Sequence, residues 1–151
     1  MAATMTRPAT SPRRRVPAPA LRLLAAGRAA LREADRAVAP GERYAFAHLS
    51  ALRAAAAVLA ARARPSDPKS TRARRPTSAW VLLSGVAPEL TECAAYFAAG
   101  ADKRAAAEAG LRSAVTAREA DDLVRDATTF LALVETTIGV LPDTVTLDWA
   151  G

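Results

Sequence analysis

The stretch GERYAFAHLSALRAAAAVLAARAR, residues 41–64, decides the fold of this protein. It is rich in alanine, the residue with the highest helix propensity, and contains no glycine or proline after its first residue. Tyr44, His48 and Leu52 recur at helical spacing, so these side chains are expected to share one face. The stretch therefore predicts one long helix that packs through this face.

Apolar side chains at helical spacing continue on both sides of this stretch. Helices are predicted over about 19–38, 41–64, 88–99, 102–109 and 117–138, with a short one that begins after Thr77 or Ser78. Thr116 and Glu119 have the spacing of a capping box before the last helix. The most strand-like run, 140–149, is broken by Pro142. The 151-residue chain is expected to be one all-α domain over residues 18–139, an antiparallel up-and-down bundle of four to five helices.

The counts of cysteine and histidine limit the chemistry. Cys93 and His48 are the only residues of their kinds, so neither an internal disulfide nor a Cys/His metal site can form. Cys93 is expected to be a buried structural residue. Glu119, Asp122 and Asp126 form an acidic line, but no second helix offers a matching Glu-x-x-His, so we expect a solvated face. Neither a metal nor a cofactor is expected.

Positive charge is concentrated outside the predicted bundle. The net charge is +6, yet residues 1–17 and 62–75 hold 10 of the 21 basic residues and 1 of the 15 acidic ones. Both segments are rich in Pro, Ser and Thr, which predicts a disordered tail over 1–17 and a basic loop over 65–76. Residues 140–151 are expected to form a C-terminal tail. These basic segments are either solvated linkers or contacts to nucleic acid or an acidic partner. The candidate contact residues are Arg13, Arg14, Arg15, Arg72, Arg74 and Arg75.

Neither an export signal nor a membrane helix is expected. Arg22 and Arg28 interrupt the apolar residues that follow the N-terminal arginines, whereas a signal peptide needs roughly 7–15 apolar residues in a row. We find no stretch close to the roughly 18 apolar residues that identify a membrane helix. The protein is therefore expected in the cytoplasm, without a membrane partner.

Arg43 and His48 are the candidates for catalysis. Histidine can transfer protons near neutral pH, and arginine can clamp a phosphate. Five residues of an ideal helix turn through about 500°, which leaves the two side chains about 140° apart. The pair predicts either a core histidine beside a solvated arginine, or an RNA-cleaving site completed by side-chain movement or a partner subunit.

Three runs carry a resemblance to a known family: GERYAFAHLSALRAAAAVLAAR, SAWVLLSGVAPELTECAAYFAAGADKRAAAEAG and VTAREADDLVRDATTFLALVE. In pattern and order they resemble an actinobacterial group of small HEPN-domain proteins (higher eukaryotes and prokaryotes nucleotide-binding). The resemblance covers roughly residues 20–138. It implies a four- to five-helix bundle, often dimeric, in a superfamily that includes RNases and toxin partners.

The chain departs from the catalytic pattern that this resemblance implies. In HEPN RNases an R-x4–6-H motif lies near the start of a C-terminal helix and is paired across a dimer. Here the last third of the chain contains no histidine, and the matching spacing lies early, at Arg43 and His48. We therefore expect a non-catalytic HEPN-like module that binds a partner protein or nucleic acid, with a homodimer as a further expectation. The alternative is a HEPN-type RNase that uses Arg43 and His48.

Overall fold

A computed structural model describes residues 15–62 and 78–140, and every regular element in these two ranges is a helix. The prediction of an all-α bundle is thereby confirmed. The predicted tail, basic loop and C-terminal tail lie almost wholly outside the described residues. The elements are α1 (Ala18–Arg36), α2 (Pro40–Arg62), α3 (Ala79–Val86), the short 3-10 helix η2 (Pro88–Leu90), α4 (Thr91–Ala99), α5 (Ala101–Glu108) and α6 (Ala117–Ile138).

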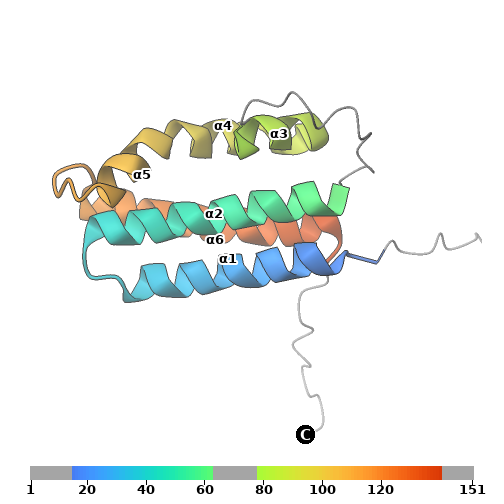
Figure 1. Ribbon diagram of the computed structural model, residues 1–151, viewed down its shortest axis with the longest axis horizontal. Helices are drawn as coiled ribbons and strands as arrows, with labels where there is room; N and C mark the ends of the chain where they lie inside the picture. Colours follow the sequence, from blue (N-terminus) through green and yellow to red (C-terminus); the bar gives the residue numbers. More distant parts are fainter. Residues whose placement is uncertain (1–14, 63–77, 141–151) are drawn as a thin grey trace, which may run out of the picture.

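Helix α2 is at the centre of the arrangement. It packs against α1, α6, α3 and α5, and α1 and α2 share the most extensive contact of any two helices. Figure 1 shows α1 along one side of α2, α6 behind it, and α3, α4 and α5 following one another along the other side. The chain reverses direction from α1 to α2, from α2 to α3–α5, and again to α6. This is the antiparallel up-and-down order expected from the sequence.

The helix boundaries follow from local chemistry. The Ser78 hydroxyl accepts a hydrogen bond from the Trp80 amide at 3.2 Å and so caps α3. The predicted capping box is present, because Thr116 and Glu119 exchange side-chain to backbone hydrogen bonds of 3.1 Å each. Helix α6 ends at Gly139, whose φ of +84° lies in the left-handed region that glycine adopts without strain.

Helices α1 and α2 approach closely because a glycine lies between them. A Cβ added at Gly27 would lie 3.3 Å from the carbonyl oxygen of Ser50 and 3.0 Å from Cδ1 of Leu131. The facing part of α2 is rich in fully buried alanines. Gly27 therefore sets the distance between the first two helices and leaves little room for any other residue.

Helix α2 is more apolar than the sequence reading allowed. By length and composition alone it could cross a membrane, so the expectation that no stretch comes close was wrong. Half of the apolar window is buried inside the bundle, and a core helix passes the same test. The high hydropathy of α2 follows from its position, since several helices pack against it.

We expect Gly27→Val to destabilise the bundle by about 1–3 kcal/mol, because the added methyl groups meet backbone and side-chain atoms at the α1–α2 contact. The matched control is Gly85→Val on α3, where an added Cβ has no neighbour within 4 Å. That control should change the free energy of unfolding by less than about 0.5 kcal/mol. Urea denaturation measures the free energy of unfolding of both variants. An equal loss of stability in Gly27→Val and Gly85→Val would contradict the close approach at Gly27.

Candidate functional site

His48 is part of the core. Its side chain is 1% exposed, and its ring lies edge-on to Trp80 with 5.9 Å between the ring centroids. The Nε2 atom lies 3.0 Å from the carbonyl oxygen of Phe97. Because a carbonyl can only accept, Nε2 carries the proton and Nδ1 is left as an acceptor. Among the described residues, Nδ1 has no hydrogen-bond partner.

Burial lowers the pKa of His48 below its ordinary value of 6.5. Removal from water disfavours the charged imidazolium, and this is the largest cause. The hydrogen bond to Phe97 acts in the opposite direction, while the positive charge of Arg104 lowers the pKa further and Glu108 raises it. His48 is therefore a neutral, fixed imidazole at pH 7.

Arg43 has a different environment. Its guanidinium forms an ion pair with Asp121 on α6, and its Nη2 donates to the carbonyl oxygen of Ala37 at 3.0 Å. These contacts join the start of α2 to α6 and to the end of α1. The guanidinium is thereby engaged in holding three helices together.

Arg43 and His48 do not meet in the described structure. Arg43 faces a recess that also contains Asp35 and Asp121, whereas His48 lies beside a pocket that contains Tyr44 and Gly100. This agrees with the angular separation expected from the sequence. The geometry assigns the two side chains to different surroundings rather than to one reaction centre.

The pocket beside His48 has a volume of about 310 Å3 and is bounded by α2, α4, α5 and α6. Its wall includes an ion pair between Lys103 and Glu119. Gly100 is required there, because a Cβ at this position would lie 2.6 Å from the Tyr44 hydroxyl oxygen. The Tyr44 hydroxyl therefore lies directly against the junction of α4 and α5.

The acidic line on α6 is occupied by other interactions. Asp122 lies 3.3 Å from the Arg125 guanidinium, and Asp126 accepts a 2.5 Å hydrogen bond from the Tyr96 hydroxyl. Burial, together with this bond to Asp126, raises the pKa of Tyr96 to about 12. No group of three or more potential metal ligands occurs within the two described ranges. Cys93 is half-buried rather than buried, because it lines a shallow groove between α4 and α6.

The basic candidates fall mostly outside the described ranges. Arg15 is exposed just before α1. Arg13, Arg14, Arg72, Arg74 and Arg75 lie outside the described residues, so their proposed contacts stay predictions.

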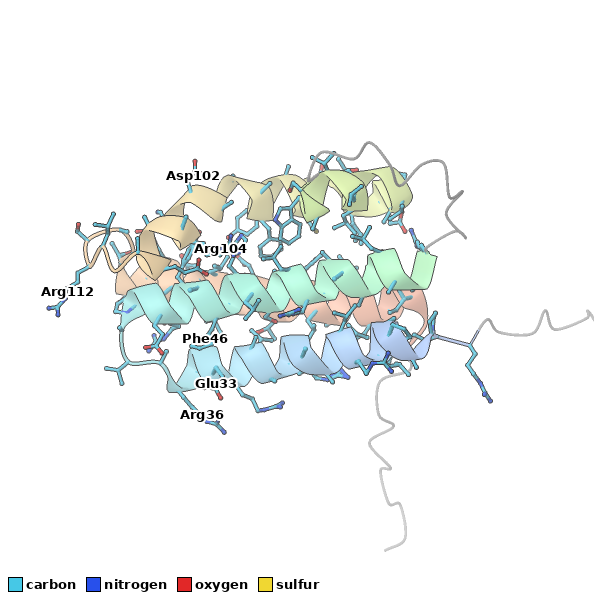
Figure 2. The ribbon with its side chains drawn as sticks, viewed as in Figure 1. Glu33, Arg36, Phe46, Asp102, Arg104 and Arg112 are labelled. Carbon is cyan, nitrogen blue, oxygen red and sulfur yellow. The ribbon has the colours of Figure 1, made fainter. Side chains whose placement is uncertain are left out.

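Sequence reasoning missed a groove of about 900 Å3 beside the first half of α2. We call it the α2 groove. Its floor is apolar, and its rim carries the charged residues Glu42, Glu108 and Arg112. Figure 2 shows Arg112 projecting from the end of the bundle beside it. The groove is lined by Ala39, Pro40, Gly41, Glu42, Ala45, Phe46, Leu49, Ala107, Glu108, Gly110, Leu111 and Arg112.

A signal for this groove was present in the sequence. Ala45 and Leu49, which line the groove, lie with Leu52 and Ala56 on the side of α2 away from most of its buried residues, and all four are only half-buried. The prediction that Leu52 shares the buried face of Tyr44 and His48 was therefore wrong. A surface helix normally carries polar side chains on such a side. The apolar character of this second side pointed to a surface that another molecule could cover.

The model of the SAV_6107-like HEPN family matches residues 34–135, which is more than half of the chain. The chain belongs to this family. The region matched to the SAV_6107-like HEPN family begins near the end of α1 and extends through most of α6, so it contains both His48 and the α2 groove. Neither the curated proteins nor the solved structures include a match to this chain.

The pH dependence of stability tests the environment assigned to His48. The unfolded chain binds the proton at a pKa of about 6.5, whereas the folded chain binds it only at lower pH. Stability should therefore fall as pH drops below about 6.5, by at most about 1.4 kcal/mol per pH unit. Carboxylates titrate nearer pH 4, so the window from pH 7 to 5 reports on this single histidine.

The matched variant is His48→Gln. Its amide can still donate to the Phe97 carbonyl but does not titrate. Urea denaturation at pH 7, 6 and 5 should show that the free energy of unfolding falls with pH in the wild type and stays constant in the variant. An identical slope in both proteins would show that His48 is not the group responsible.

Proposed function

We propose that this protein is a non-catalytic, cytoplasmic binding module whose α2 groove holds a protein partner. The observation that carries this proposal is the apolar stripe of Ala45, Leu49 and Phe46 on the outer side of α2, which the other described helices leave only half-buried. The side of a surface helix that faces water normally carries polar side chains. A partner on the α2 groove would complete that burial.

The charge of the described residues favours a protein over a nucleic acid as the partner. They include 13 Arg and Lys and 12 Asp and Glu, so this part of the chain is close to neutral. A phosphate backbone is bound by a surface with a clear excess of positive charge. The rim of the α2 groove carries Glu42 and Glu108 as well as Arg112, which suits a mixed protein surface.

We propose a second copy of this chain as the occupant. Two large apolar side chains protrude at the same end of the bundle: Val38 is 91% exposed and Leu111 is 60% exposed. A two-fold axis brings the same patch of both copies together, so the protrusions of one copy can enter the groove of the other. The same symmetry can place Arg112 of each copy near Glu42 of its partner, which matches opposite charges twice.

The separate environments of Arg43 and His48 support a role without catalysis. A general acid–base group must come within hydrogen-bond reach of the reacting proton, and the one free ring nitrogen of His48 is fully buried. The competing proposal is RNA cleavage by this pair. Metal-independent cleavage of RNA that disappears in a folded His48→Ala variant would overturn the non-catalytic role.

Sedimentation equilibrium of the full chain tests the dimer. We expect the wild type to dimerise and Leu111→Glu to be monomeric, because the new carboxylate would have to enter an apolar groove. The matched control is Val81→Glu, since Val81 is 63% exposed but lies on α3. This control should dimerise like the wild type. A monomeric wild type, or a monomeric control, would exclude the α2 groove as the site of self-association.

A further inference from the structure

Helix α5 is the one described helix that contributes no fully buried residue to the core. It is only 8 residues long, none of its residues is buried, and it lies between Gly100 and Gly110. Gly110 has a φ of +84°, which ends the helix in the left-handed conformation. A helix this short has little stability of its own, so α5 depends on its contacts with neighbouring helices.

The main contact of α5 is with α2, and the side chains of α5 that make it are small or partly exposed. Lys103 forms a partly exposed ion pair with Glu119 on α6, and Ala107 lies against Gly41 at the start of α2. Partly exposed ion pairs contribute little to stability. The ion pair between Arg104 and Glu108, at 3.7 Å, lies within α5 and does not tie it to the bundle. These are the features of a segment that opens locally while the rest of the domain stays folded.

Two unpaired polar atoms lie beneath this helix. Nδ1 of His48 and Nε of Arg104 are both fully buried without a hydrogen-bond partner among the described residues. Figure 2 shows Arg104 between α5 and α2, whereas Asp102 points away from the bundle. Buried polar atoms without partners disfavour the closed arrangement, because opening returns them to water.

A proton on His48 would add a second penalty. The imidazolium would share its surroundings with the positive Arg104, and its new Nδ1–H would have no acceptor. Glu108 opposes this, but it is paired with Arg104.

Among the described residues, the pocket beside His48 contains no free acidic group that would stabilise a positive charge on the ring. Its other charged groups are Lys103, Glu119 and Asp122. Glu119 is paired with Lys103, and Asp122 with Arg125. The Tyr44 hydroxyl is the remaining polar group that α2 contributes to this pocket, and it is neutral. Movement of α5 would solvate the charged ring without unfolding the other helices.

We propose that α5 is a hinged cover over His48, and that protonation of His48 opens it and removes one wall of the α2 groove. Ala107 and Glu108 of α5, and Gly110 to Arg112 just after it, all line that groove. Opening would therefore weaken the docking of a second copy at mildly acid pH. This last consequence rests on the proposed dimer, whereas the movement of α5 does not.

Amide hydrogen exchange of the full chain at pH 7.0 and 5.5, corrected for the intrinsic exchange rate, tests the cover. We expect protection of the α5 amides to fall by about 8-fold. Protonation of an exposed imidazole favours opening by the factor 1 + 10^(pKa − pH), and for a pKa of about 6.5 this factor rises about 8-fold between the two pH values. Protection in α2 and α6 should stay constant. His48→Gln should abolish the change, and Arg118→Gln, which removes an exposed charge at the start of α6, should leave it intact.

The outcomes separate this proposal from the dimer. An equal loss of protection in α2 and α6, or an unchanged response in His48→Gln, would overturn the cover. If that variant does not fold, the NMR titration of the single imidazole decides, because its midpoint must coincide with that of the α5 amides. A dimer whose dissociation constant is the same at both pH values would overturn the link to the groove. A wild type that is monomeric at both pH values would refute the dimer while leaving the α5 measurement valid.

Discussion

The bundle depends on the close packing of α2 against helices on several of its sides. Most of the buried residues of α2 are alanines, whose small side chains let neighbouring backbones approach. On α1, Gly27 has no side chain at the point where that helix contacts α2. Small side chains contribute little volume each, so the larger groups of the core come from elsewhere. The rings of Trp80, Phe97 and Phe130 form a cluster in the core, with neighbouring centroids 5.0–6.2 Å apart.

The helices could be predicted because their signals are local. Prolines, glycines and the Thr116–Glu119 capping box mark helix ends within a few residues, and the structure confirms these positions to within one or two residues. The position of His48 on the packing face of α2 was also local information. Its burial followed from the stripe that it shares with Tyr44.

The partners of each side chain could not be predicted in the same way. Phe97 accepts the hydrogen bond from His48 across 49 residues, and Asp121 pairs with Arg43 across 78. Such pairs depend on how helices rotate about their axes when they pack, and a single sequence does not determine those rotations. The α2 groove was missed for a related reason, since its walls come from two chain turns and the end of α5. Cys93 illustrates the same limit, because helical spacing did not reveal the shallow groove beside it.

The order of helices along the chain has a consequence for folding. Helices α1 and α2 are neighbours in sequence and share the largest contact, so this hairpin can form early from local contacts. Helix α6 also packs on α2, but it is synthesised after all the other described helices. Before α6 is made, the long apolar helix α2 is open to water along a face that later becomes part of the core. A nascent or truncated chain that lacks residues 117–138 is therefore the form of this protein most exposed to aggregation.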